Sequence, residues 1–322
     1  MMCAKRKGQS VDIFENDIRI PDTQQCGVGL GNFDGLHRGH MALINTLLHE
    51  CHVNNLRSVV YTFKKHPEHI LRKELFTPLI MTMEHKAELL ERTGLETLFF
   101  QEFDEEFSRI PAENFVKEIL INKLRSKLVV VGFNYRFGYM GKGDADLLRK
   151  MGSKYGFRVI VIPPVKVGKE VVSSTLIRQY IMKGQMEKAF ELLGRYFSVP
   201  GKVVKGLKMG SKMGFPTANI IPEKFLGMPA SGVYITRTQY QGKWYDSVTN
   251  VGKSPTIKND NVTTIETHMM GFTGELYGED IEVFFLKKLR NEKHFKTRDE
   301  LIKQIRTDVE KVQMYKKHLY LG

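Results

Sequence analysis

The sequence predicts an α/β domain followed by a smaller all-β domain that ends in a helix. Between Cys26 and about Val165, short apolar runs alternate with helical patterns, which is typical of a parallel sheet with crossover helices. After Gly194 the apolar residues recur with a period of two, and glycine-bearing turns separate the segments. We therefore predict a doubly wound parallel sheet in a first domain, residues 1–186, and a small antiparallel β-barrel with a terminal helix in a second domain, residues 187–322.

The strands of the first domain are expected where short segments are rich in β-branched or aromatic residues. These segments are CGVGL at 26–30, VVYTF at 59–63, TLFFQEF at 97–103, KLVVVGF at 127–133 and FRVIVIPPV at 157–165. Apolar residues three and four apart predict helices between and after them. The predicted helices cover residues 41–52, 82–94, 111–124, 144–156, 173–184 and 185–194, with Gly94 placed to end one helix and Pro111 to open the next.

The second domain is expected to contain strands joined by tight turns. Its period-two segments are FSVPGKVVKGL at 197–207, GVYITRTQY at 232–240, KWYDSVTNVG at 243–252, VTTIETHMM at 262–270 and DIEVFFLKKL at 280–289. Turns such as Gln241-Gly242 separate these segments, which favours a small antiparallel barrel. An amphipathic helix over Thr297–His318 closes the chain.

Composition limits the class of protein. Hydrophobic residues make up 42% and charged residues 26% of the 322 residues, and no apolar run approaches the roughly 18 residues that a membrane helix needs. The basic N-terminus, MMCAKRKGQS, is not followed by an apolar stretch of signal-peptide type. Cys3, Cys26 and Cys51 are too few and too badly spaced for a disulfide framework or a zinc site. We expect a cytoplasmic protein that does not bind a membrane.

The formal charge of +13 suits a partner that carries phosphates. Lysines are scattered through both halves, and no RNA-binding signature with interleaved aromatic residues is visible. Small polyphosphates are therefore favoured over nucleic acid.

The segment GNFDGLHRGH, residues 31–40, lies where the first predicted strand gives way to the first helix. Open parallel sheets bind ligands at this carboxyl edge. A helix N-terminus offers unpaired backbone N–H groups and the positive end of its dipole there, so phosphate is the expected ligand. His37 and His40 would add hydrogen-bond donors, and Gly35 and Gly39 would let the backbone approach the ligand closely.

Two other interpretations of the histidine pair stay open on the residues alone. A histidine in a turn is often solvated or satisfied by a neighbour. Metal-binding histidines on a helix usually stand four residues apart and need a third ligand, whereas His37 and His40 stand three apart and no carboxylate is an obvious third ligand.

Further motifs give the segment its context. In order and spacing, HRGH at 37–40, FKKHP at 63–67, GFNYRFGYMGKGD at 132–144 and SSTLIR at 173–178 resemble the adenylyltransferase half of the bacterial bifunctional riboflavin kinase/FAD synthetase (FMN adenylyltransferase) family. The first motif alone would indicate only the wider HxGH nucleotidyltransferase superfamily. The resemblance implies a Rossmann-like nucleotidyltransferase domain.

This resemblance implies roles for individual residues. His37, His40 and Arg178 would be catalytic, holding ATP phosphates while the FMN phosphate attacks the α-phosphate directly, so that alignment and charge stabilisation suffice. The implied nucleotide-binding residues are Gly31, Asn32, Phe33, Asp34, Gly39, Asn134, Ser174 and Thr175, and the implied flavin-binding residues are Phe63, His66, Pro67 and Phe137. By themselves, the SST segment would be an ordinary helix N-cap and Arg178 a solvated charge, and Phe137 could equally pack in the core.

The second half carries its own set of motifs. GSKMGFPTANI at 210–220 resembles the riboflavin kinase motif, and VTNVGKSPT, IETHMMGFTGELYG and LRNEKHF follow in the family's order. The resemblance implies that Thr217 and Asn219 hold Mg²⁺ and ATP phosphates, that Glu266 is the general base and that Arg290 faces the flavin. Alone, PTAN would be a turn, Glu266 an outward strand residue and Arg290 a solvated charge.

The kinase motif departs from the family at one point. Relatives often have arginine directly after the glycine that corresponds to Gly210, whereas this chain has Ser211 followed by Lys212. Lys212 can supply the charge but lacks the forked geometry of arginine, which predicts a weaker grip on ATP by Gly210 and Lys212.

The sequence therefore predicts a transferase that phosphorylates riboflavin to FMN and adenylylates FMN to FAD with release of pyrophosphate. ATP would be the co-substrate and Mg²⁺ the metal. Two alternatives stay open: an FAD synthetase whose barrel is a weak or inactive kinase that binds flavin, and a basic nucleic-acid-binding or regulatory protein that senses flavin. The predicted partners are riboflavin, FMN and ATP, without nucleic acid or membrane, and the oligomeric state, a homo-oligomer included, is left open.

Overall fold

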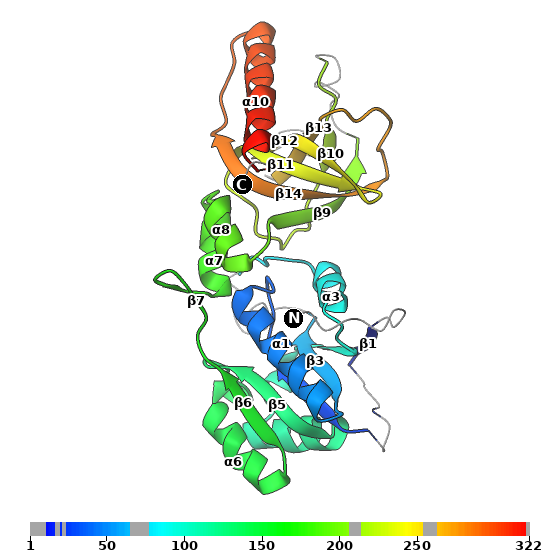
Figure 1. Ribbon diagram of the computed structural model, residues 1–322, viewed down its shortest axis with the longest axis vertical. Helices are drawn as coiled ribbons and strands as arrows, with labels where there is room; N and C mark the ends of the chain where they lie inside the picture. Colours follow the sequence, from blue (N-terminus) through cyan, green and yellow to red (C-terminus); the bar gives the residue numbers. More distant parts are fainter. Residues whose placement is uncertain are drawn as a thin grey trace. The chain divides into compact units, whose positions relative to one another are not determined.

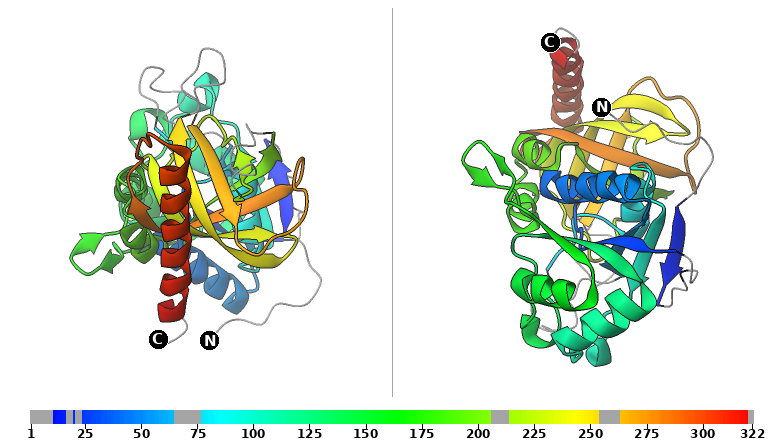
Figure 2. Two further views of the ribbon diagram at one scale, coloured as in Figure 1. Left: turned by 90° about the horizontal axis from the view of Figure 1, so that it is seen from above. Right: turned by 60° about the horizontal axis from the view of Figure 1, so that its bottom comes forward.

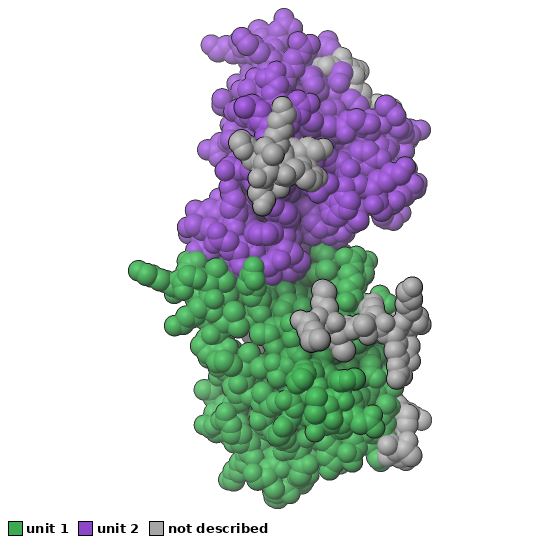
Figure 3. Space-filling view, viewed as in Figure 1, with its two compact units in different colours: residues 1–174 green, residues 175–322 purple. Residues whose placement is uncertain are grey.

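The computed structural model describes residues 11–16, 20, 24–64, 77–205, 214–253 and 263–319. The chain divides into two compact units, Met1–Ser174 and Thr175–Gly322 (Figure 3). The division falls at the start of helix α7 (Ser174–Met182), ahead of residue 186, where the sequence predicts the domain boundary.

Unit 1 contains a six-stranded parallel sheet with the order β1-β4-β3-β2-β5-β6. Its strands are β1 (Asp12–Glu15), β2 (Cys26–Leu30), β3 (Arg57–Phe63), β4 (Thr97–Gln101), β5 (Ser126–Gly132) and β6 (Arg158–Ile162). The chain runs from β2 outward through β3 to β4 and then crosses to β5 on the other side of β2. The carboxyl end of β2 is therefore a topological switch point, the place where open α/β sheets bind ligands.

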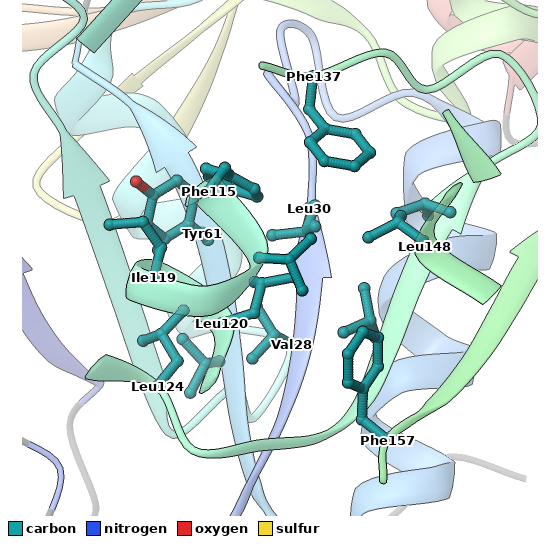
Figure 4. Close-up of a cluster of buried hydrophobic side chains, with 14 of the residues drawn as sticks. Val28, Leu30, Tyr61, Phe115, Ile119, Leu120, Leu124, Phe137, Leu148 and Phe157 are labelled. Atoms are coloured by element: carbon teal, nitrogen blue, oxygen red, sulfur yellow. The ribbon is translucent and has the colours of Figure 1, made fainter. Parts of the chain in front are cut away.

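Helices cover both faces of this sheet, as the doubly wound prediction requires (Figure 1). On one face α1 (Arg38–Val53) and α3 (Met83–Glu91) bury Leu43, Ile44, Leu47 and Leu90 against the strands. On the other face, a helix over Phe115–Lys123, labelled η1, and α6 (Ala145–Tyr155) form a second apolar cluster with Val28 and Leu30 of β2 (Figure 4). The fold class is confirmed, and β2 is completely buried between the two layers.

Two details of unit 1 differ from the sequence prediction. The α-helix predicted over 111–124 is a short α5 (Ala112–Asn114) continued by η1, which is a π-helix in which Leu124 N donates to Ile119 O. Apolar spacings of three and four residues cannot distinguish the two helix types over so short a segment. The sequence prediction also lacks β1 and the small hairpin of β7 (Lys166–Val167) and β8 (Glu170–Val171), because these strands are short and largely exposed.

Unit 2 contains a closed antiparallel barrel with the order β10-β13-β12-β11-β14-β9. Its strands are β9 (Phe197–Val204), β10 (Ala218–Ile220), β11 (Gly232–Tyr240), β12 (Lys243–Lys253), β13 (Thr263–Met269) and β14 (Asp280–Arg290). Helix α8 (Met186–Leu193) packs on β9 and β14, and α10 (Arg298–Leu319) packs on β12 beside the barrel (Figure 2). The predicted barrel and terminal helix are confirmed, with β10 as an additional short strand.

Part of the barrel interior is lined with hydroxyl groups instead of apolar side chains. Five of its residues are fully buried and hydrogen-bonded to one another: Thr236, Thr238, Ser247, Thr249 and Thr267. Over the described ranges, no helix has the length and apolar character to span a membrane.

Candidate active sites

The first candidate site is the turn that joins β2 to α1. His37 is the N-cap of α1, with extended backbone, and its Nδ1 accepts a hydrogen bond from the backbone N–H of His40 at 3.2 Å. Because Nδ1 accepts, a neutral His37 carries its proton on Nε2. The cap therefore fixes the tautomer that offers an N–H donor on the far side of the ring.

The two histidines of the motif stack on each other. Their ring centroids lie 3.6 Å apart with an interplanar angle of 13°, and Phe33 meets His40 edge-on at 5.3 Å. A Cβ added at Gly39 would lie 3.1 Å from His37 Cε1, so a side chain there would press on the stack. The glycine between the histidines is thus explained by the packing of His37.

The turn backbone has an unusual conformation. Phe33, Gly35 and Leu36 all have positive φ, at 51°, 84° and 38°. The strain of positive φ at two non-glycine residues is typical of functional turns, and the Leu36 N–H donates to the Phe33 carbonyl at 3.3 Å within this turn. At Gly35 an added Cβ would also lie 2.8 Å from Ile80 Cδ1.

Side chains from other elements hold the carbonyl groups of this turn. The Asn32 carbonyl accepts hydrogen bonds from Thr62 Oγ1 at 3.0 Å and from Lys86 Nζ at 2.8 Å.

Asp34 anchors the turn at a second point. Its carbonyl accepts a hydrogen bond from Ser174 Oγ at 2.8 Å. The Asp34 side chain accepts a further bond from the backbone N–H of Ile80 at 2.9 Å. Asn32, Asp34, His37, His40 and Ser174, predicted from motifs far apart in the chain, therefore lie together.

Lys86 is a residue of this site that the sequence prediction missed. Its side chain is only 8% exposed, and burial lowers the pKa of its ammonium group to about 8, although the nearby Asp34 charge acts in the opposite direction. A signal was present in the sequence, because Lys86 occupies an apolar-face position of α3, four residues before the buried Leu90. Lysines at such positions are rarely fully buried, which makes the observation informative.

The two aromatic residues implied to bind flavin lie in one continuous set of ring contacts. Phe63 is half-buried and meets Phe107 at 5.8 Å, Phe107 meets Phe115 at 6.3 Å, and Phe115 meets Phe137 at 5.4 Å. Phe137 is 6% exposed and belongs to the apolar cluster of Figure 4, which favours core packing for its ring. His66 and Pro67 lie outside the described residues.

Asn134, Thr175 and Arg178 are the remaining residues that the adenylyltransferase motifs predict. Asn134 is exposed in the turn after β5, the strand that pairs with β2. Thr175 is exposed and Arg178 is half-buried on α7, in unit 2.

The second candidate site lies on the outer face of the barrel. Glu266 of β13 is the register partner of Asn219 on β10 and of Asn250 on β12, so these three residues form a row across three strands. Their neighbours along the strands, such as Thr267 and Thr249, are fully buried, which places the row on the opposite face. Asn250 is an addition to the sequence prediction.

Atoms around the Glu266 carboxyl group make it less acidic. Much of the residue is exposed at the surface, yet desolvation of the carboxyl group by its neighbours raises its pKa above the usual value. A raised pKa makes a carboxylate a better proton acceptor.

His268 connects this row to the PTAN segment. Its Nδ1 lies 2.8 Å from the Pro216 carbonyl oxygen, and its ring meets Phe215 edge-on at 5.5 Å. A carbonyl can only accept, so Nδ1 carries the proton. Thr217, half-buried, follows Pro216 directly, and Asn219 lies two residues further on.

Arg290 is engaged by the terminal helix. Its guanidinium donates through Nε and Nη2 to Asp308 Oδ2 at 3.0 and 2.8 Å, and Asp308 is 1% exposed. Two residues later, Glu292 Oε1 lies against Gly252, where an added Cβ would meet it at 2.5 Å. A flavin contact by Arg290 stays a prediction, and Gly210, Ser211 and Lys212 lie outside the described residues.

Fold and sites together define a class of protein. A doubly wound sheet with a strained, histidine-bearing turn at its switch point fits an enzyme that handles nucleotides, and it is followed by a barrel that carries a carboxylate beside amide and hydroxyl groups. The class is a two-part enzyme that handles phosphates at two places.

Comparison with known proteins gives the family. The FAD synthetase family model matches residues 19–176 and the riboflavin kinase family model matches residues 193–316. The bifunctional riboflavin kinase/FMN adenylyltransferase of Buchnera aphidicola subsp. Schizaphis graminum is 35% identical over 89% of this chain and 93% of its own length. The protein of the same name from Escherichia coli K12 is 35% identical over 88% of this chain and 90% of its own. The chain belongs to the bifunctional riboflavin kinase/FMN adenylyltransferase family, which confirms the resemblance predicted from the motifs.

A solved structure shares the fold over nearly the whole chain. The crystal structure described as a macrolide-efflux protein from Streptococcus pneumoniae superposes with a TM-score of 0.85 at 31% identity, covering 94% of this chain and 99% of that one.

Proposed function

We propose that the chain is a bifunctional transferase that phosphorylates riboflavin to FMN in unit 2 and adenylylates FMN to FAD in unit 1, with ATP in both reactions. Membership of the family supports both activities over the FAD-synthetase-only alternative. The observation that carries the assignment of sites is that each unit has its own set of phosphate-handling groups: the anchored Asn32–His40 turn and the Asn219–Glu266–Asn250 row.

For AMP transfer, an FMN phosphate oxygen would attack the α-phosphorus of ATP, and pyrophosphate would leave. No enzyme nucleophile is required, so the work of the site is alignment and stabilisation of charge. His37 would donate from Nε2 to a phosphate oxygen, because its Nδ1 is committed to the helix cap. His40, stacked on it, would add a further donor, with Gly31, Phe33, Gly39 and Asn134 around the nucleotide. Roles for Thr175 and Arg178, which belong to unit 2, stay predictions from the motif.

For phosphorylation, the riboflavin hydroxyl would attack the γ-phosphorus of ATP, ADP would leave, and the hydroxyl proton would pass to Glu266. The raised pKa of Glu266 suits this role. Thr217 and Asn219 offer hydroxyl and amide oxygens, which are hard ligands that fit Mg²⁺. Mg²⁺ bound there would neutralise charge on the ATP phosphates.

A product assay tests both activities. The purified chain is incubated with riboflavin, ATP and Mg²⁺, with oxidised and with reduced flavin, and the flavins are separated by chromatography. We expect FMN and then FAD to form. FAD from supplied FMN without any FMN from riboflavin would leave the FAD-synthetase-only alternative, and the absence of both products would favour a flavin-sensing protein.

We further infer a reducing, cytoplasmic location. The support is the small number of cysteines in the sequence and the state of two of them, because Cys26 and Cys51 are buried free thiols. The mass of the chain in solution, measured by light scattering, would decide whether it forms a homo-oligomer.

A further inference from the structure

Lys86 is a buried cation next to the phosphate-binding turn that the proposed reaction does not use. Its Nζ lies 2.8 Å from the Asn32 carbonyl oxygen and 3.4 Å from Thr62 Oγ1, and Thr62 is itself fully buried and bonded to the same carbonyl. The three groups form a closed triangle between α3, β3 and the turn. A lysine in this position destabilises the fold, because burial disfavours the charged ammonium group and thereby lowers its pKa.

The geometry of the peptide bond gives this contact a consequence for the ligand. In a trans peptide, the C=O of one residue and the N–H of the next point in opposite directions. Holding the Asn32 carbonyl toward Lys86 and Thr62 therefore directs the Phe33 N–H away from them. Ser174 orients the Asp34–Gly35 peptide in the same way, because it holds the Asp34 carbonyl and thereby directs the Gly35 N–H to the opposite side.

The charge of Lys86 acts through the same peptide. A hydrogen bond from an ammonium group polarises the carbonyl that accepts it, and this polarisation strengthens the N–H donor at the other end of the peptide. An anion that faces the Phe33 N–H would thus accept a stronger hydrogen bond from this group. It would also be attracted by the Lys86 ammonium charge on the far side of the peptide.

We propose that Lys86 is a positioning residue for AMP transfer: it holds the Asn32–Phe33 peptide so that its N–H faces the ATP phosphates, and it strengthens that donor. This inference rests on the proposed function of unit 1. The same contacts could instead have a purely structural role, in which they hold α3 against the sheet. The two roles differ in their effect on ATP binding: only the positioning role predicts a higher KM for ATP when Lys86 is replaced.

The test compares Lys86→Met, Lys86→Gln and a matched control, Lys150→Met, which removes an exposed lysine of α6 on the other face of the sheet. Rates of FAD formation from FMN are measured against ATP concentration, riboflavin phosphorylation is measured on the same preparations, and thermal unfolding is followed by circular dichroism. Riboflavin phosphorylation serves as an internal control because its site lies in unit 2.

We expect Lys86→Met to lower kcat/KM for ATP in AMP transfer by about 10- to 100-fold, the effect of a small misplacement of a binding group. The KM for ATP should rise, and Lys86→Gln, which keeps an N–H donor without the charge, should lose less. Lys150→Met and riboflavin phosphorylation should be unchanged.

Three results would overturn the proposal. The first is full AMP transfer in Lys86→Met. The second is a lower kcat at an unchanged KM together with a lower unfolding temperature, because a partly unfolded population produces that pattern. The third is an equal loss of kcat/KM for ATP in Lys86→Gln and Lys86→Met. If Lys86→Met does not fold, an unchanged KM for ATP in Lys86→Gln contradicts the proposal. Absence of AMP transfer in the unaltered chain would instead count against the proposed function.

Discussion

His37 and Lys86 show what a sequence can and cannot reveal about single residues. His37 was predictable because its motif, HxGH at a strand-to-helix junction, is local in the chain. Its partner in the cap, the His40 backbone N–H, lies three residues away. The position of Lys86 on the apolar face of α3 is a sequence signal for burial, but its contact was not predictable, because its partner is a backbone carbonyl 54 positions away.

The buried Lys86 ammonium also makes the stability of unit 1 depend on pH. Its pKa in the folded protein is about 8, below the 10.5 of an ordinary lysine. Between these values the unfolded chain binds more protons than the folded one, so the free energy of unfolding rises with pH. By linkage, the full rise is about 3 kcal/mol. Below pH 8 the group is charged in both states and the burial penalty is fully present.

We therefore expect the difference in unfolding free energy between the unaltered chain and Lys86→Met to shift in favour of the unaltered chain from pH 8 to pH 10.5. Urea unfolding at several pH values in this window measures the difference. Lys150→Met should show the same pH dependence as the unaltered chain, since Lys150 is exposed. A parallel dependence for Lys86→Met would mean that the ammonium is not desolvated.

At the scale of elements, periodicity predicted the long strands and helices and missed what is short or set by tertiary contacts. The strand β10 has only three residues and follows a proline-bearing segment, so the sequence alone suggested a turn there. The inward positions of β11 were also unexpected, because a period-two pattern assigns apolar residues to an interior. Thr236 and Thr238 occupy those positions, and only the strands that face them supply their hydrogen-bond partners.

The interior hydroxyl groups form a chain that is satisfied from end to end. Thr236 lies 2.7 Å from Thr249, Thr249 donates to Thr267 at 2.8 Å, Thr267 lies 3.3 Å from Thr238, and Thr238 lies 2.7 Å from Ser247. Ser247 donates onward to the Tyr245 carbonyl at 3.2 Å. Thr267 and Thr249 are the neighbours of Glu266 and Asn250, so the chain fixes from inside the strands that carry the outer row.

Replacing Thr267 by valine removes a central member of this chain while keeping the shape of the side chain. The Thr249 hydroxyl would lose its acceptor inside the barrel, which costs about 1–3 kcal/mol of unfolding free energy. We expect riboflavin phosphorylation to fall with this stability and AMP transfer to stay unchanged, measured by the product assay and by urea unfolding. Thr264→Val, whose half-buried hydroxyl has a single long bond of 3.5 Å to the Gly252 carbonyl, should change stability by less than about 0.5 kcal/mol. Equal effects of the two changes would contradict a role for the chain.

At the scale of the whole molecule, the order of elements and the change of period after Gly194 were sufficient to predict two architectures in one chain. The closure of the barrel and the strand order of the sheet agree with that prediction. What the sequence left unassigned is the set of groups that contact each candidate site from distant segments: Thr62 and Lys86 in unit 1, and Asn250 and His268 in unit 2. Their roles depend on register and on backbone partners, which only the folded chain defines.

Because the two proposed sites lie in different units, the two activities should be separable by single substitutions. His37→Asn keeps a side-chain oxygen for the helix cap, a position that asparagine favours, but removes the imidazole donor at Nε2. We expect it to lower FAD formation from FMN by about 10²- to 10³-fold, as the loss of a preorganised donor does, with riboflavin phosphorylation unchanged. Glu266→Gln removes the proton acceptor on β13 and should lower FMN formation by about 10²- to 10⁴-fold, with AMP transfer from supplied FMN unchanged.

The product assay on the two variants, and on their equimolar mixture, measures this directly: each variant should lack one step, and the mixture should recover FAD from riboflavin. Loss of both activities in either single variant would mean that the sites are not independent, and an active His37→Asn would show that the histidine serves only as a cap.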